Sequence, residues 1–320
     1  MNILRNLRRK ATTIAAAGAV VALGATVVTA QVTVDESLPT YEPTSGVSGN
    51  IKSVGSDTLN NLMTLWAEEF KSLYPQADVE IEGKGSSTAP PALISGTSQL
   101  GPMSRAMKAG EVEKFTEEFG YAPTPIRTAV DALAVFVHKD NPIDNLTLEQ
   151  VEQVFSVNGP DNVTWGDLGA TGEWADKPVS LYGRNSASGT YGFFKSAALG
   201  KADYKATVKE QPGSSAVVQG IASDKFGIGY SGIGYLTADV KAVAIDGVAA
   251  NADNAYSGDY PLARFLYVYV NVPPNQSPTP IVKEFLTMVL SKQGQQVVLK
   301  DGYYPITNVI AQEDLAKLGG

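Results

Sequence analysis

The sequence predicts an α/β fold in which mostly parallel sheets are flanked by helices. Short apolar segments rich in β-branched residues alternate along the chain with segments whose apolar residues recur at helical spacing. Several of the strand-like segments run directly into small, hydroxyl-bearing residues that are typical of helix starts. The length of 320 residues and the hydrophobic content of 43% suggest two domains with cores of their own.

The alternation continues through the whole chain after residue 48. Over 59–73, Leu62 and Trp66 lie on one helical face, and Thr147 with Gln150 makes a capping box for a later helix. We expect strands at 50–54, 79–81, 129–138, 179–182, 228–230 and 264–270, and helices at 59–73, 108–119, 190–199 and 278–290.

The first thirty residues have the pattern of a secretory signal peptide. A basic stretch ends at Lys10, residues 11–34 carry no charge, and small residues lead up to Ala30. We expect cleavage near Ala30 and export to a periplasm or beyond, with a membrane anchor as the alternative. Residues 31–48 are polar, lack periodicity and are expected to form a flexible segment.

Composition excludes several classes of function. The chain has no cysteine and a single histidine, which rules out disulfides, thiolate catalysis and a metal site built on two histidines. Residues 31–320 carry 21 basic and 33 acidic residues, so nucleic acid is not an expected partner. No cofactor and no metal are expected.

Three segments share one design for binding an anion. They are Gly55-Ser56-Asp57-Thr58, Gly85-Ser86-Ser87-Thr88 and Ser188-Gly189-Thr190, and each joins a predicted strand to a predicted helix. Helix starts offer unpaired N–H groups and a partial positive charge, and the hydroxyls add further donors. One such segment would indicate only an ordinary N-cap, whereas three of them favour an anion site.

Arg184 is the charged candidate for that site. It ends a predicted strand four residues before Ser188, and its planar guanidinium can bind two oxygens of a tetrahedral anion. A salt bridge to an acidic residue is the alternative.

With these three segments and Arg184, the part of the chain from residue 49 to residue 310 resembles the periplasmic phosphate-binding proteins of bacterial ABC-type phosphate transporters. The most specific stretch is Arg184-x-x-x-Ser188-Gly189-Thr190; the supporting stretches are Gly55 to Leu59, Gly85 to Ser87, Gly101 to Arg105, Ala129 to Val135, Tyr260 to Arg264 and Gly302 to Ile306. The resemblance implies a type II periplasmic-binding-protein fold, with two lobes that close on phosphate in a cleft at the hinge. Lobe one would hold 49–133 and 263–320, and lobe two 134–262. The strands at 129–138 and 264–270 would both cross between the lobes.

The resemblance also implies a set of phosphate-binding residues. Ligand positions of the family match Ser86, Arg184, Ser188, Gly189 and Thr190, and its first binding turn matches Ser56, Asp57 and Thr58. Relatives have an aspartate that accepts the phosphate's proton at the place where this chain has Ser104.

Two other carboxylates could accept that proton, Asp57 first and Asp131 in reserve. Because sulfate carries no proton at neutral pH, such an acceptor would exclude it. Arg105 either reaches the anion or pairs with a carboxylate.

The expected function is that of an exported, monomeric receptor that passes inorganic phosphate to the membrane permease of an ABC transporter. The chain is not expected to be an enzyme. The alternatives are a receptor for another tetrahedral oxyanion, such as sulfate or molybdate, and a secreted phosphatase-like hydrolase.

Overall fold

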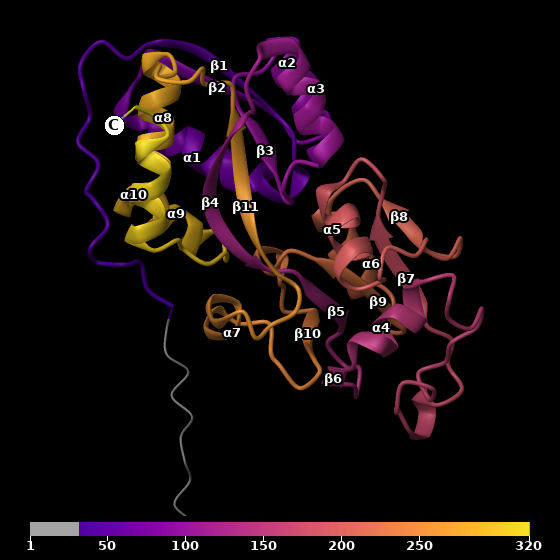
Figure 1. Ribbon diagram of the computed structural model, residues 1–320. Coiled ribbons are helices and arrows are strands. Elements are labelled where there is room, and N and C mark those ends of the chain that lie inside the picture. Colours follow the sequence, from indigo (N-terminus) through magenta and orange to yellow (C-terminus); the bar gives the residue numbers. More distant parts are fainter. Residues whose placement is uncertain (1–31, 320) are drawn as a thin grey trace, which may run out of the picture. The chain divides into compact units, whose positions relative to one another are not determined.

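The computed structural model describes residues 32–319, so the predicted signal peptide lies outside the described residues. Within 32–319 the chain is α/β, with its strands in a two-stranded, a three-stranded and a six-stranded sheet (Figure 1). None of the helices in this range is long and apolar enough to cross a membrane.

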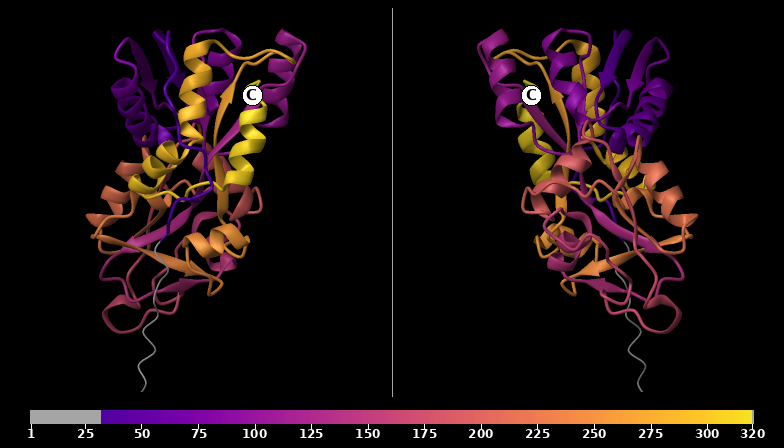
Figure 2. Two further views of the ribbon diagram at one scale, coloured as in Figure 1. Left: turned by 90° about the vertical axis from the view of Figure 1, so that its left-hand side faces the viewer. Right: turned by 90° about the vertical axis from the view of Figure 1, so that its right-hand side faces the viewer.

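Residues before 133 and after 262 build the two smaller sheets. β1 (Gly49–Val54) pairs in parallel with β2 (Ala77–Glu82), and β11 (Ala263–Val270) lies antiparallel between β3 (Gly101–Met103) and β4 (Thr124–Ala132). The accompanying helices are α1 (Asn60–Leu73), α2 (Ala89–Ile94), α3 (Ala109–Phe119), α8 (Pro280–Val289), α9 (Lys292–Lys300) and α10 (Asn308–Ala316). In both views of Figure 2 the yellow C-terminal helices lie in the upper part of the molecule, together with the indigo α1.

The middle of the chain builds the six-stranded sheet, in the order β6-β10-β5-β9-β7-β8. Its strands are β5 (Ala134–His138), β6 (Asn145–Leu146), β7 (Ser180–Arg184), β8 (Lys209–Gln211), β9 (Gly227–Ser231) and β10 (Val240–Ile245). The helices of this part are α4 (Leu148–Phe155), α5 (Gly189–Ala197), α6 (Ser214–Ala222) and α7 (Ala252–Ser257). Short 3-10 turns are η1 (Asp57–Leu59), η2 (Ser86–Thr88), η3 (Gly172–Trp174) and η4 (Ile233–Tyr235).

The sheets are mixed rather than mostly parallel. β5 is antiparallel to both of its neighbours, and all pairings of β11 are antiparallel. β4 runs into β5 through the single residue Leu133, so β5 does not enter its sheet through the helical crossover that joins parallel strands.

The run 129–138 is divided at Leu133 and joins two sheets. Its first part ends β4 and its second part is β5, so the chain passes from the three-stranded to the six-stranded sheet there. The Leu133 N–H donates to the Leu262 carbonyl at 3.0 Å, directly before β11 begins. β11 then stays within the three-stranded sheet, so the expectation that the strand at 264–270 also crosses is wrong.

Residues 32–48 pack against the core, which differs from the flexible segment that the sequence predicts. Val34, Leu38, Tyr41 and Val47 are buried among core side chains. The Tyr41 hydroxyl donates to Glu284 at 2.7 Å. Residues 32–48 form neither helix nor strand, so their apolar residues lack the periodicity that would reveal them.

Candidate functional site

The first two hydroxyl-bearing turns lie at one edge of the parallel pair β1 and β2. Parallel strands end at the same edge, so Gly55 and Gly85, which follow these strands, are brought together. The Gly85 N–H donates to the Gly55 carbonyl at 2.7 Å. Ser56 and Ser86 then each begin a turn that leads into a helix, as the sequence predicts.

The third turn meets them from the six-stranded sheet. Gly85 has a φ of +117°, and a Cβ on it would lie 2.5 Å from the Ala187 carbonyl oxygen, so only glycine fits. The Ser87 N–H donates to that carbonyl at 3.1 Å. Ser188 caps α5, where its hydroxyl accepts the Tyr191 N–H at 3.3 Å.

The three turns and the residue that follows β3 bring four buried hydroxyls into contact, which we call the hydroxyl cluster: Thr58, Ser86, Ser104 and Thr190. Thr58 Oγ1 lies 2.7 Å from Thr190 Oγ1, and Ser104 Oγ lies 3.4 Å from Thr190 Oγ1 and 3.3 Å from Ser86 Oγ. Ser86 Oγ also accepts the Ser104 N–H at 3.0 Å. Hydroxyls rotate to donate or accept, so this cluster can turn its hydrogens toward an anion.

Gly189 is the point of closest approach to the cluster. A Cβ at Gly189 would lie 2.1 Å from Ser86 Oγ and 2.7 Å from Ser104 Oγ. The start of α5 therefore comes this close to the second turn only because it carries glycine.

Arg264 orients the cluster and was missed by the sequence analysis. Its Nη2 donates to Thr190 Oγ1 at 3.0 Å and its Nη1 donates to the Ser104 carbonyl at 2.8 Å. Because arginine only donates, the Thr190 hydroxyl accepts from it and keeps its own hydrogen for another acceptor. The available signal was its place in the stretch Tyr260 to Arg264, which carries part of the family resemblance.

Arg184 is buried with a side-chain exposure of 1%. Its Nη1 donates to Ser214 Oγ at 2.7 Å and lies 3.2 Å from Asp57 Oδ2. Burial lowers the pKa of the Arg184 guanidinium, and the charge of Asp57 opposes this shift. Within residues 32–319 its buried Nε has no hydrogen-bond partner, so a donor is left for a ligand. Ser214 was also missed, although Gly213-Ser214-Ser215 is a further small, hydroxyl-bearing helix start.

The two candidate carboxylates already serve other partners. Asp57 Oδ2 accepts the Ser214 N–H at 2.7 Å. Asp131 is fully buried, and its Oδ2 accepts from Arg264 Nε and Nη2 at 2.9 and 2.7 Å while its Oδ1 accepts the Ile233 N–H at 2.9 Å. In the described part of the chain, neither carboxylate hydrogen-bonds directly to the hydroxyl cluster.

Two further predicted residues lie outside the cluster. Ser56 is buried and precedes η1, and its N–H donates to the Pro102 carbonyl at 2.7 Å. Arg105 forms a two-pronged pair with Glu111, with both contacts at 2.7 Å, so the alternative that it pairs with a carboxylate is confirmed. Burial raises the pKa of Glu111, but the hydrogen bonds from Arg105 and from the Lys108 N–H outweigh it and leave that pKa lowered.

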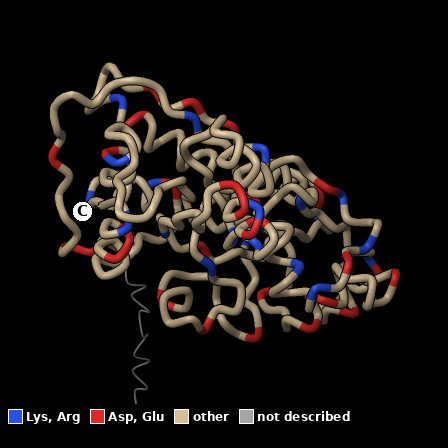
Figure 3. The backbone as a smooth tube through the Cα atoms, turned by 45° about the horizontal axis from the view of Figure 1, so that its top comes forward, with Lys and Arg blue, Asp and Glu red and all other residues tan. Residues whose placement is uncertain are grey.

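The arrangement suits a compact oxyanion. Neutral hydroxyls and helix-start N–H groups converge from all three sheets, with the Arg264 guanidinium on Thr190 and the Arg184 guanidinium beside Asp57. Across residues 32–319 no group of three His, Asp or Glu side chains could hold a metal ion. Figure 3 shows basic and acidic residues interspersed along the described part of the chain.

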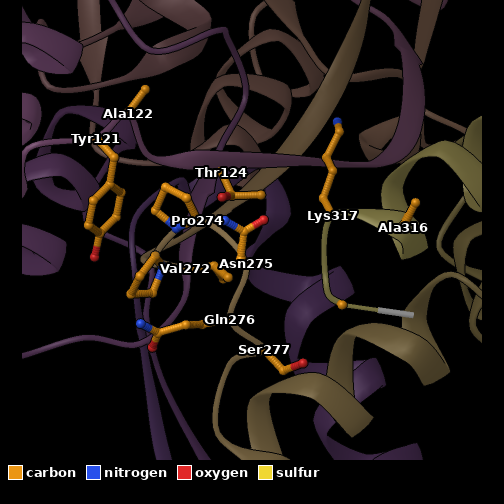
Figure 4. Close-up of a pocket in the computed structure, with 12 residues that line it drawn as sticks. Tyr121, Ala122, Thr124, Val272, Pro274, Asn275, Gln276, Ser277, Ala316 and Lys317 are labelled. Carbon is orange, nitrogen blue, oxygen red and sulfur yellow. The ribbon is translucent and has the colours of Figure 1, made fainter.

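Two hollows are relevant to the choice of site. A hollow of about 390 Å³ is lined by residues of the first turn and of η4, including Asp57, Asn61, Tyr235 and Asp301; it touches the site through Asp57 and is lined by neither the hydroxyl cluster nor Arg184. A larger hollow of about 690 Å³ lies elsewhere, between Tyr121, the 272–277 loop and Lys317 (Figure 4). Neither the cluster nor Arg184 lines this larger hollow, so it is not part of the candidate anion site.

Comparison with known proteins gives one consistent family. Residues 40–293 match the family model of the PBP superfamily domain. The chain is 56% identical over 310 residues to the phosphate-binding protein PstS of Pseudomonas aeruginosa, covering 93% of this chain and 96% of that protein. It is 30% identical over 274 residues to PstS of Bacillus subtilis, covering 83% and 84%.

Solved structures agree with this fold. A substrate-binding protein of Clostridium perfringens, solved with bound phosphate, superposes with a TM-score of 0.71 at 26% identity, covering 81% of this chain and all of that one. An ABC-type phosphate transport receptor of Vibrio cholerae superposes with a TM-score of 0.65 at 22% identity, covering 80% and 100%. The predicted two-lobed, type II periplasmic-binding-protein fold is thereby confirmed.

Proposed function

Since this chain belongs to the PBP superfamily, and within it to the family of the phosphate-binding protein PstS, we propose that it captures inorganic phosphate and delivers it to an ABC transporter permease. We propose a binding protein and not an enzyme, since the relatives found for it are named phosphate-binding or substrate-binding proteins. The observation that carries the proposal is the hydroxyl cluster beside the buried Arg184, within a chain 56% identical to a phosphate-binding protein.

The site has enough donors for tight binding. Each charge-assisted hydrogen bond contributes about 1.5–3 kcal/mol, and a micromolar complex needs about 8 kcal/mol. Phosphate would replace the hydroxyl-to-hydroxyl contacts of the cluster with contacts to its own oxygens. The proposed binding residues are those of the sequence analysis: Ser56, Asp57, Thr58, Ser86, Ser104, Asp131, Arg184, Ser188, Gly189 and Thr190.

For the acceptor of the phosphate's proton we now favour Asp131 over Asp57. The Arg264 guanidinium connects Asp131 to the hydroxyl cluster, because it donates to both Asp131 and Thr190. Asp57 is engaged instead by Ser214 and Arg184. A carboxylate acceptor favours hydrogen phosphate over sulfate because only the former has a proton to donate.

The proposal includes two moving lobes. Lobe one comprises residues 49–133 and 263–320, and lobe two comprises residues 134–262, in line with the change of sheet at Leu133 and before β11. The protein acts as a monomer in the periplasm or outside the cell after cleavage near Ala30. Residues 32–48 belong with lobe one, because Tyr41 bonds to Glu284 on α8.

A ligand panel tests the proposal against its alternatives. Thermal unfolding of the mature protein is followed with phosphate, arsenate, sulfate and molybdate, beside an assay for phosphate release from a phosphomonoester. We expect phosphate and arsenate to raise the melting temperature, with no release of phosphate. A larger shift with sulfate or molybdate would favour the other-oxyanion alternative, and turnover would favour the hydrolase.

A further inference from the structure

Asp57 spans the cleft between the proposed lobes. It begins η1 in lobe one, yet its Oδ2 accepts the N–H of Ser214, the first residue of α6 in lobe two, at 2.7 Å. The same oxygen lies 3.2 Å from Nη1 of Arg184, which also belongs to lobe two. A carboxylate at a helix start is favoured both by the N–H group and by the helix dipole.

Neighbouring groups make the same connection. The Tyr235 hydroxyl in lobe two donates to the Asp57 carbonyl at 3.1 Å. Burial raises the pKa of Tyr235, so its hydroxyl stays protonated and able to donate at neutral pH. The backbone and the side chain of Asp57 are therefore both fastened to lobe two.

We propose that Asp57 is a positioning residue that latches the two lobes shut and holds Arg184 in its binding position. The proposal rests on the proposed function and gives Asp57 a role other than accepting the phosphate's proton. Opening the cleft would separate Asp57 from Ser214 and Arg184 and break both contacts. Because these contacts form only where the two lobes meet, they favour the closed state whichever anion is bound.

Asp57→Asn keeps the size of the side chain and removes its charge. The amide oxygen can take the place of Oδ2 beside the Ser214 N–H and Arg184 Nη1, but it is neutral, so the attraction between the carboxylate charge and the guanidinium is lost. We expect phosphate to dissociate roughly 10- to 100-fold faster, the range for loss of one or two charge-assisted contacts. The ratio of phosphate to sulfate affinity should stay that of the wild type, because in this role Asp57 does not accept the proton of the ligand.

Asp301→Asn is the matched control. Asp301 lines the same hollow and is largely buried, but its side chain bonds to Asn61, within the same lobe. The control loses the same charge without losing a contact across the cleft. It should leave the rate of phosphate dissociation unchanged.

A second pair of variants acts on the partner of Asp57. Ser214→Pro deletes the N–H that Asp57 accepts, at a helix start where proline is tolerated. Gly213 already has the extended backbone, φ −141° and ψ 164°, that a residue before proline requires. Ser214→Ala removes only the hydroxyl that accepts from Arg184. Faster dissociation in Ser214→Pro than in Ser214→Ala isolates the backbone contact to Asp57.

The separation of the lobes is measured directly with paired spin labels. The chain has no cysteine, so Ser72→Cys on α1 and Ser223→Cys after α6, both exposed, provide unique labels. We expect Asp57→Asn to shift the distances without phosphate toward longer values, and Asp301→Asn to match the wild type. This readout needs no ligand, so it tests the latch even if the wild type fails to bind phosphate.

Three results would overturn the latch. The first is an Asp57→Asn protein with wild-type distances and a wild-type dissociation rate. The second is an equal effect of Asp301→Asn, which would indicate a general response to lost charge. The third is a change in the phosphate-to-sulfate ratio in Asp57→Asn without a change in lobe distances, which would make Asp57 the proton acceptor.

Discussion

Adding one methyl group at Gly189 should prevent the lobes from closing on phosphate. A Cβ at this position would lie 2.1 Å from Ser86 Oγ, whereas ordinary contacts begin near 3.4 Å, so the two turns would have to separate by more than an ångström. Ser86 cannot easily yield, because its hydroxyl holds the Ser104 N–H and is fully buried. Overpacking of this kind costs about 1–3 kcal/mol, which corresponds to a roughly 5- to 150-fold loss of phosphate affinity in Gly189→Ala.

Calorimetric titration with phosphate measures this loss, and thermal unfolding without ligand checks the fold. The unfolding temperature should change little, since the clash lies between the lobes and not within one core. Gly192→Ala is the control, because it lies on the same helix and its Cβ would meet only Arg105 atoms at 3.6 Å. Wild-type phosphate affinity in Gly189→Ala would refute the close approach of α5 to the hydroxyl cluster.

Three further predictions concern charged groups. Arg184→Lys should weaken phosphate binding by roughly tenfold or more in calorimetry, because an ammonium cannot keep the fork of contacts; an unchanged affinity would return Arg184 to a structural role. Asp131→Asn should lower the free energy of unfolding by roughly 3 kcal/mol in urea titrations, because it breaks a buried ion pair with Arg264. The same variant should also lower the preference for phosphate over sulfate. Adding Arg264→Gln to the Asp131→Asn protein should recover part of the lost stability. Burial raises the pKa of Asp301 from 3.8 to about 6, so the stability it contributes is full below the unfolded pKa and is lost as the pH rises through the folded one. Asp301→Asn should therefore stabilise the protein at about pH 8 by about 1–2 kcal/mol after allowance for solvent screening, and this gain should vanish below about pH 4 in melting curves; a gain that is the same at both pH values would contradict the shift.

Features with a local signal could be predicted from the sequence. The turns at Ser56, Ser86 and Ser188 precede helices as expected, since their residue types favour helix starts whatever surrounds them. Arg184 ends β7 as expected and lies buried at the site.

Features that depend on pairing between distant segments could not be predicted. Arg264 reaches the cluster only because β11 pairs with β4 and places it opposite Asp131. The hydrogen bond between the Ser214 N–H and Asp57 joins residues that are 157 positions apart in the sequence. Likewise, the packing of residues 32–48 is set by the surface of α8 and α9 and not by any periodicity of their own.

The central claim is that phosphate is the ligand of this site. Its most direct test is calorimetric titration of the purified mature protein with inorganic phosphate, in buffer that contains an excess of sulfate. We predict saturation at one phosphate per chain with micromolar or tighter affinity, undisturbed by sulfate. The absence of binding heat, or the loss of phosphate binding when sulfate is present, would contradict the account.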